Sequence, residues 1–320
     1  MLMNIEILFN FCMVMGVTIA LSSNNWMTIW LGLELSTMCF IPVMSKKFKL
    51  NSESCIKYFI IQSMSSSIMM MGVIMMSMLN TNTSILTLSI ILKLGVSPMH
   101  TWVISIIEGM NYYPIFLMLT LMKMGPISML SYLNENLNLF IMLGLLIGSI
   151  SGLNQNSIKK IIGYSSVFNM SLIISSINNL EIWLTFFLTY TISLIMLIYL
   201  IMKLNVNFIN QMVINNYSLL NKTSCWISIL SMGGFPPLVG FFGKLLVIKF
   251  LITEKEFMIS SMVILMSLIV MFFYTRMMIL SMMSLFTIPK WVLMNKLNFN
   301  SFIIMVSMMT PLIMFNLKSL

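Results

Sequence analysis

The feature that most constrains the fold is the recurrence of apolar runs, each about 20 residues long, along the whole chain. A run of this length matches the roughly 30 Å of hydrocarbon that an α-helix crosses in a bilayer. Only 8% of the 320 residues are charged, whereas soluble domains have roughly 25%. We therefore expect an all-α polytopic membrane protein, a single membrane domain over residues 1–320 with about eleven spans. The expected spans are 3–22, 25–44, 56–79, 84–107, 112–132, 138–153, 161–178, 180–203, 225–252, 257–283 and 301–318.

The distribution of lysines predicts the orientation of these spans. Lysines gather on the even-numbered connections, at Lys46, Lys47, Lys49, Lys57, Lys159, Lys160, Lys203, Lys222, Lys290 and Lys296. The odd-numbered connections are uncharged or acidic, as in the sequence TEKE of the ninth. Lysine-rich loops stay on the cytoplasmic or matrix side, so the N-terminus is predicted inside and the C-terminus outside. This bias accounts for much of the net charge of +9, and no basic patch interleaved with aromatic residues indicates nucleic-acid binding.

The residues that hold metals and redox cofactors are sparse in the sequence. Cys12, Cys39, Cys55 and Cys225 show no C-x-x-C spacing, and His100 is the one histidine. Zinc, haem and iron–sulfur sites need several such ligands, so we expect this chain alone to build none of them. The sequence also has no glycine-rich phosphate loop and no nucleophile elbow. Any chemistry here must therefore use few groups.

Four charged residues lie inside apolar runs, namely Glu34, Lys93, Lys123 and Lys244. Each opposes insertion by roughly 2.5–3.5 kcal/mol at a helix centre, and charges retained at such a cost mark ion or proton paths. A structural alternative stays open, in which Glu34 pairs with a lysine to hold helices together or long side chains reach an interface. Reaching an interface suits Lys249 and Arg276 better, because both lie nearer to span ends.

Two of the expected spans are interrupted by glycine and proline. The fourth contains LGVSPMH and the ninth contains GGFPPLVG, and each has a lysine near its interruption. Proline removes a backbone donor, and the freed carbonyl groups are tolerated in a membrane only inside protein or beside a water-filled cavity. The interruptions lie five spans apart, which predicts inverted five-helix repeats at 1–132 and 138–283, followed by a C-terminal span at 301–318. The alternative is that Gly and Pro are simply commoner in membrane helices.

Four stretches of the sequence resemble a known family. They are WLGLELS, LKLGVSPMHTW, GSISGLNQNSIKKIIGYSS and GGFPPLVGFFGK, in this order over about residues 25–250. Together they are similar to the antiporter-like proton-pumping subunits of respiratory complex I. The resemblance implies that Glu34 and Lys93 are the family's Glu–Lys pair. It also implies that Lys123 is the central lysine and that Lys244 is the lysine toward the outside exit.

The sequence departs from the family pattern at several positions. Met99 replaces the usual aromatic residue before His100, and Leu-Met replaces the usual Trp-Gln before the central lysine. Asn169 stands where the family often has a histidine, so a water chain or a hydroxyl must connect the central and outer lysines. The role of His100 stays open between a functional residue and a structural partner for the backbone freed at the break.

The resemblance also implies a function and a location. The chain would translocate protons in the membrane arm of the proton-translocating NADH:ubiquinone reductase, driven by electron transfer in other subunits. The parent complex would use NADH, FMN, iron–sulfur clusters and ubiquinone, with none bound by this chain. Its partners would be neighbouring antiporter-like and small membrane-arm subunits and the lipid of the mitochondrial inner membrane. The 39 methionines fit the extra Met codons of invertebrate mitochondria.

The buried charges predict how such a relay works. Burial disfavours a charged lysine whereas a nearby carboxylate favours it, so movement of Glu34 would hold or release a proton on Lys93 toward Lys123. The adjacent break would supply backbone mobility and room for water. Two other classes of protein fit the same residues. One is a stand-alone cation/proton antiporter, and the other is a passive scaffold subunit that tolerates neutral replacements of the lysines.

Overall fold

The computed structural model describes residues 2–45, 49–79, 83–133, 135–214 and 219–283. Within these ranges the chain is helical and has no β-strand, so the expected all-α fold is confirmed there. The expected span at 301–318 and the lysines at 46, 47, 290 and 296 lie outside the described residues. The helices are α1 (Leu2–Ser22), α2 (Trp26–Met44), α3 (Lys49–Leu79), α4 (Ser84–Leu94), α5 (Thr101–Gly109), α6 (Tyr112–Leu119), α7 (Leu121–Ser131), α8 (Asn138–Leu153), α9 (Ile158–Ser175), α10 (Leu180–Leu204), α11 (Gln211–Ile214), α12 (Leu219–Gly233), α13 (Val239–Thr253) and α14 (Phe257–Met283).

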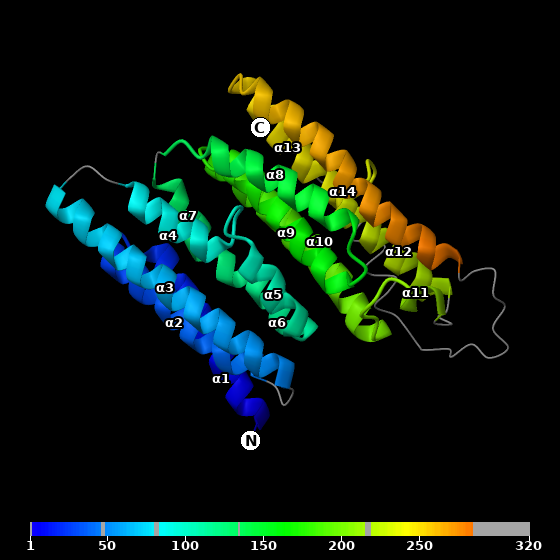
Figure 1. Ribbon diagram of the computed structural model, residues 1–320, viewed down its shortest axis with the longest axis horizontal. Helices are drawn as coiled ribbons and strands as arrows, with labels where there is room; N and C mark the ends of the chain where they lie inside the picture. The colour runs from blue at the N-terminus through cyan, green and yellow to red at the C-terminus, as the bar shows by residue number, and fades with distance from the viewer. Residues whose placement is uncertain (1, 46–48, 80–82, 134, 215–218, 284–320) are drawn as a thin grey trace. The chain divides into compact units, whose positions relative to one another are not determined.

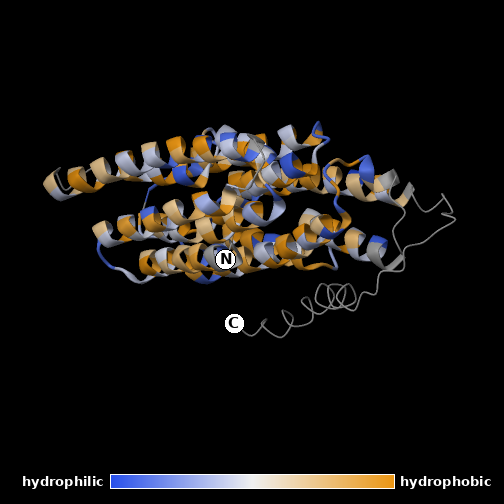
Figure 2. Cartoon of the chain, turned by 90° about the horizontal axis from the view of Figure 1, so that it is seen from below, coloured by the Kyte–Doolittle hydropathy of each residue, from blue (hydrophilic) through white to orange (hydrophobic). Residues whose placement is uncertain are grey.

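Several of these helices are long and apolar enough to cross a membrane. Figure 2 shows hydrophobic residues along much of the helical ribbon, with hydrophilic residues scattered between them. Among the described residues the five qualifying segments are Trp26–Met44, Asn51–Met78, Tyr112–Ser131, Leu180–Leu204 and Phe257–Met282. Each coincides with one of the expected spans. The chain is therefore a multi-pass helical membrane protein, and the full count of eleven spans stays a prediction.

The chain divides into two compact units, Met1–Gly144 and Leu145–Leu320. In the first unit α1 packs along α2, α3 contacts α2, α4 and α5, and α7 contacts α1, α2 and α4 (Figure 1). In the second unit α10 contacts α9, α12 and α13, while α14 contacts α11, α12 and α13. Each unit contains one of the two interrupted spans.

Small residues bring α1 and α2 close together in the first unit. Gly16 and Ala20 on α1 face Gly32 and Ser36 on α2, each pair being four residues apart. A Cβ added to Gly32 would lie 2.7 Å from the backbone nitrogen of Ala20, and one added to Gly16 would lie 2.7 Å from that of Ser36. Close backbone approach between small residues is a main source of helix association in membranes. This packing fixes the rotation of α2 and hence the direction of Glu34.

Both predicted breaks are confirmed. The fourth span divides into α4 and α5, and the ninth divides into α12 and α13. At the first break Gly95 has a φ of +67°, its N–H donates to Leu92 O over 3.2 Å, and Val96 N–H donates to Ile91 O over 3.3 Å. This pair of hydrogen bonds is the Schellman motif, which ends a helix at a left-handed residue and is most easily adopted by glycine.

The second break repeats the first in detail. Gly234 has a φ of +82°, its N–H donates to Ser231 O over 3.2 Å, and Phe235 N–H donates to Leu230 O over 3.1 Å. The offsets from the glycine are the same as in the first break, and a proline follows three residues later in both (GVSP and GFPP). The same Schellman motif therefore ends a helix inside a span in both units.

A third irregularity, which the sequence analysis did not predict, divides the span expected at 112–132. Thr120 separates α6 from α7, with φ −114° and ψ −84°. Its hydroxyl and its N–H both donate to Phe116 O, over 2.7 and 3.1 Å. A threonine that competes in this way for a carbonyl of the preceding turn bends a helix. As a result Lys123 lies in the first turn of α7, directly after the bend.

Candidate functional site

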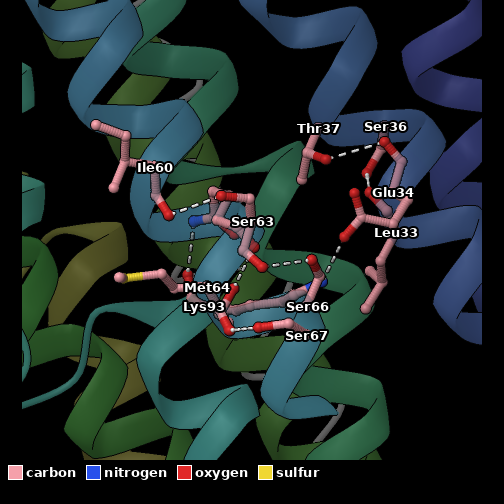
Figure 3. A network of polar contacts seen from close by, with 12 residues as sticks. Leu33, Glu34, Ser36, Thr37, Ile60, Ser63, Met64, Ser66, Ser67 and Lys93 are labelled. Atoms are coloured by element: carbon pink, nitrogen blue, oxygen red, sulfur yellow. Dashed lines mark hydrogen bonds and ion pairs between the residues drawn. The ribbon is translucent and has the colours of Figure 1, made fainter. Parts of the chain in front are cut away.

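Glu34 and Lys93 meet inside the first unit. Glu34 Oε1 lies 3.6 Å from Lys93 Nζ, with 18% of the glutamate side chain and 2% of the lysine side chain exposed. Figure 3 shows the two side chains reaching toward one another from α2 and α4. Both atoms are buried and have no hydrogen-bond partner among the described residues. The contact is therefore an ion pair held by charge alone, and both groups keep free hydrogen-bonding capacity.

The hydroxyl groups around this pair are committed to their own helices. On α2, Ser36 Oγ donates to Leu33 O over 2.7 Å and Thr37 Oγ1 donates to Glu34 O over 2.9 Å. Ser63, Ser66 and Ser67 of α3 donate in the same way to carbonyls three residues before them (Figure 3). Their protons are thus used, whereas their oxygen lone pairs can still accept hydrogen bonds.

The end of α4 places Lys93 beside its break. The Gln62 side-chain amide donates to Lys93 O over 3.5 Å, and the Trp102 indole donates to Leu92 O over 3.2 Å. Side chains of α3 and α5 thus bind two carbonyl groups at the end of α4, of which Leu92 O also accepts from Gly95 N–H. The C-terminal end of a helix also favours a nearby positive charge, which suits an ammonium in the last turn of α4.

Lys93 and Lys123 line one cavity. This cavity has a volume of ≈ 20 Å³ and is also lined by Tyr58, Gln62 and Trp102. A polar cavity of this size holds about one water molecule. Lys123 is only 5% exposed, and no described carboxylate lies within ion-pair distance of it. The structure therefore brings together three of the predicted residues, namely Glu34, Lys93 and Lys123.

Close packing of α7 against α2 accounts for this position of Lys123. A Cβ added to Gly125 would lie 2.6 Å from Leu33 Cδ2 and 3.7 Å from Ala20 Cβ. Glycine therefore lets α7 approach the crossing of α1 and α2. Because Lys123 is two residues before Gly125 on α7, this approach also places Lys123 near the Glu34–Lys93 ion pair.

Lys244 lies in the second unit, at the second break. Its Nζ donates to Gly233 O over 2.8 Å and lies 5.6 Å from the centre of the Phe168 ring. The lysine thus caps the C-terminal end of α12 from the first turns of α13. It also lines a cavity of ≈ 10 Å³ together with Asn169 and Tyr190, so the position of the missing family histidine borders this lysine.

The remaining candidates lie outside these two cavities. His100 Nδ1 is 3.1 Å from Pro98 O, so the ring contacts backbone at the break, and its role stays a prediction. Lys249 is exposed on α13. The guanidinium of Arg276 donates to Leu153 O and Gln155 O, each over 2.7 Å, and so anchors the end of α8, while its place relative to the membrane interface stays a prediction.

Sequence reasoning missed the polar residues that line the cavities. Tyr58 and Gln62 are four residues apart on α3, which places both on one helix face toward Lys93. Polar side chains at that spacing inside an apolar run were a usable signal. Trp102 and Tyr190 carried no such signal, because single aromatic residues are ordinary in membrane helices. Among the described residues, no group of three or more His, Cys, Asp or Glu could hold a metal ion.

Comparisons with known proteins agree with the motifs. Residues 23–91 and 77–259 match the family described as NADH:quinone oxidoreductase/Mrp antiporter, TM. The chain is 34% identical over 309 residues to NADH-ubiquinone oxidoreductase chain 2 of Anopheles gambiae, covering 91% of this chain and 90% of that protein.

Two solved structures have a similar fold. A chain of respiratory complex I from Thermus thermophilus has a TM-score of 0.77 at 17% identity, covering 87% of this chain and 70% of that chain. A chain of the Mrp complex from Dietzia sp. DQ12-45-1b has a TM-score of 0.74 at 15% identity, covering 82% of this chain and 57% of that chain. The match to the family model and the 34% identity to a relative over most of both chains show the family. The chain belongs to the NADH:quinone oxidoreductase/Mrp antiporter membrane family, among the NADH-ubiquinone oxidoreductase chain 2 proteins.

Proposed function

We propose that this chain is a membrane-arm subunit of respiratory complex I that carries protons across the mitochondrial inner membrane through a relay of buried charges. The name shared by its sequence relatives supports the assignment to this complex. The observation that carries the relay is local. Glu34 and Lys93 form a buried ion pair, and Lys93 lines the same water-sized cavity as Lys123.

The relay depends on the distance between Glu34 and Lys93. At 3.6 Å the carboxylate stabilises the ammonium form of Lys93. When the carboxylate moves away, burial alone acts on the lysine and favours loss of its proton. A water molecule in the shared cavity takes that proton and passes it to Lys123. Two lysines on one cavity disfavour being charged together, so loading Lys93 helps Lys123 to pass its proton onward. Lys244 receives the proton later, on the way to the outside.

The driving free energy comes from other subunits. NADH, FMN, iron–sulfur clusters and ubiquinone react in the parent complex, and we assign no redox centre to this chain. Its partners are the neighbouring antiporter-like and small membrane-arm subunits, together with membrane lipid. These partners follow from the membership of the relatives in complex I and not from a contact seen here.

The arrangement in the membrane is part of the proposal. We propose eleven spans in two inverted repeats, at 1–132 and 138–283, with a C-terminal span at 301–318. The shared turn and the Gly-x-x-Pro sequence at both breaks support a repeat. The N-terminus lies on the matrix side and the C-terminus on the intermembrane-space side, as the lysine bias indicates.

A stand-alone cation/proton antiporter is the alternative, and the fold does not exclude it because the Mrp complex chain has a similar TM-score. Native-gel separation of mitochondrial membranes distinguishes the two. Migration within a very large NADH-oxidising assembly supports the complex I subunit. A small particle that exchanges sodium for protons in liposomes without partners would support the antiporter instead.

Substitution of Lys123 tests the relay. Lys123→Met keeps the apolar stem but removes the titrating group. Lys123→Arg keeps the positive charge but does not release its proton. We expect both variants to assemble and to lose at least about 90% of coupled proton transfer, a tenfold effect that corresponds to about 1.4 kcal/mol on the transfer step. The measurement is proton uptake per NADH oxidised in sealed vesicles.

Lys249→Met is the matched control for this experiment, because that lysine is exposed on α13. It should leave proton uptake unchanged. Normal pumping by Lys123→Met would assign Lys123 to a scaffold. Normal pumping by Lys123→Arg alone would make Lys123 a fixed charge and contradict the relay.

A further inference from the structure

A residue that lines the cavity beside Lys244 has a buried hydroxyl group without a partner. Tyr190 lies on α10, is 4% exposed and lines this cavity. Its hydroxyl oxygen is completely buried and has no hydrogen-bond partner among the described residues. A buried hydroxyl that forms no hydrogen bond is costly, so native proteins pair such groups with protein or with ordered water.

The hydrogen bonds of the other polar groups in the cavity restrict which ligand could bind the Tyr190 hydroxyl. Thr189, Ser193 and Ser231 donate their hydroxyl protons to Phe186 O, Tyr190 O and Ser228 O, each over 2.8 Å. Each can therefore only accept a further hydrogen bond. Lys244 has three N–H donors and uses one of them on Gly233 O. The cavity thus combines unused donors on Lys244 and Tyr190 with unused acceptors on the short hydroxyl side chains.

A water molecule is the ligand that satisfies this combination. It accepts two hydrogen bonds and donates two, and the cavity of ≈ 10 Å³ lies at the lower limit of the volume that one water needs. A polyatomic anion would not fit a cavity of this volume. A larger polar molecule would not fit.

We propose that this cavity is a bound-water site in which the Tyr190 hydroxyl holds one water molecule against Lys244 Nζ. Tyr190 is a positioning residue, since it acts through the water. The inference rests on the proposed proton relay and names the water that takes the proton onward from Lys244. Tyr190 would then supply the hydroxyl group beside Asn169, at the position where the family often has a histidine.

The transfer at this site is balanced in atoms and charge. A protonated lysine gives one proton from Nζ to the water oxygen, and the water gives one of its own protons to the next oxygen along the path. The water is unchanged afterwards, and Lys244 is left neutral and ready to accept again. Tyr190 keeps its proton throughout and fixes the orientation of the water.

Tyr190→Phe removes this hydroxyl and keeps the ring. We expect proton uptake per NADH oxidised by the assembled complex to fall about fivefold, the change expected from one net hydrogen bond lost on the transfer step. The loss should be larger in D₂O, because the proton step becomes rate-limiting. Tyr274→Phe is the matched control. Tyr274 is also buried in the second unit, but its hydroxyl donates to Ser165 Oγ over 2.8 Å and it does not line the cavity.

The outcomes separate this inference from the relay itself. If Lys244→Met abolishes pumping while Tyr190→Phe and Tyr274→Phe both pump normally, the water site is wrong and the relay stands. If Lys244→Met pumps normally, both are wrong. Equal losses in the two tyrosine variants would assign the effect to packing and overturn the water site.

A measurement on the unaltered protein keeps the test independent of folding. A high-resolution structure of the parent complex should show water density within hydrogen-bond distance of both Tyr190 Oη and Lys244 Nζ. A dry cavity, or a protein side chain bonded to the Tyr190 hydroxyl, would overturn the proposal.

Discussion

At the scale of single residues, the separation of Glu34 and Lys93 is the informative quantity. At 3.6 Å the two charges attract each other strongly in a buried environment but share no hydrogen bond. A purely structural buried pair is expected to close to hydrogen-bond distance, because only good geometry offsets the loss of hydration. The glutamate is also the more exposed partner. In the proposed relay, the carboxylate is therefore the group that moves.

Glu34→Gln tests this asymmetry. The change keeps the volume of the side chain but leaves the buried ammonium of Lys93 without its counter-charge, a loss that costs roughly 3–5 kcal/mol for a fully buried pair. We expect proton pumping to fall more than the amount of assembled complex, measured by proton uptake and by native-gel staining of the same membranes. Glu53→Gln is the control, since Glu53 pairs with Lys57 in an exposed contact. Normal pumping with Glu34→Gln would remove Glu34 from the path.

The sequence was sufficient to find the charged residues but not their surroundings. Glu34, Lys93 and Lys123 could be identified because a charge inside an apolar run is costly and therefore rare. Tyr190 could not be identified, because a buried tyrosine in an apolar run is ordinary when its hydroxyl has a partner. Whether a partner exists depends on three-dimensional packing, which a linear pattern does not contain.

At the scale of helices, each break consists of a helix that ends at a glycine and a second helix that begins a few residues later. Gly95 and Gly234 adopt left-handed backbone conformations that other residues adopt only at a cost of roughly 1–2 kcal/mol. The glycine and proline residues at the two interruptions therefore predicted both breaks from local chemistry alone. The bend at Thr120 could not be predicted in this way, since no glycine or proline lies at that position. It arises from a hydroxyl competing for Phe116 O.

Adjacent glycines at the second break allow a controlled test. A Cβ on Gly234 would lie 2.8 Å from Lys244 Nζ in addition to the backbone cost, whereas a Cβ on Gly233 would meet Tyr274 Cβ at 3.2 Å. We expect Gly234→Ala to lower pumping at least twofold more than Gly233→Ala when proton uptake is normalised to assembled complex. The reason is that only the first change displaces the lysine. Equal effects of the two substitutions would show that the left-handed turn does not position Lys244.

At the scale of the whole molecule, the hydrophobic runs and the lysine distribution predict how the chain threads the membrane. Five of the predicted spans coincide with helices that are long and apolar enough to cross it. Hydropathy succeeds here because lipid offers no hydrogen bonds, so a spanning segment must be an apolar helix. The orientation follows from charge alone and stays a prediction.

Labelling with a membrane-impermeant amine reagent decides the orientation. Lys57 and Lys160 should react in inside-out vesicles, in which the matrix side faces outward. Lys255, exposed in the ninth connection, should react only in intact mitoplasts, in which the intermembrane side faces outward. Peptide mass spectrometry reads the modified positions. Labelling of all three from one side would contradict the predicted threading.

The smallness of the cavity between Lys93 and Lys123 has a consequence for ion selectivity. With a volume of ≈ 20 Å³ it has no room for an alkali cation and its hydration shell. Such a cation would need a replacement set of oxygen ligands, as channel filters provide through rings of carbonyls, and here a lysine ammonium group would repel it. A proton needs only a hydrogen bond to pass. In the proposed relay, discrimination between sodium and protons therefore arises from steric exclusion at this cavity, and the liposome exchange assay tests it.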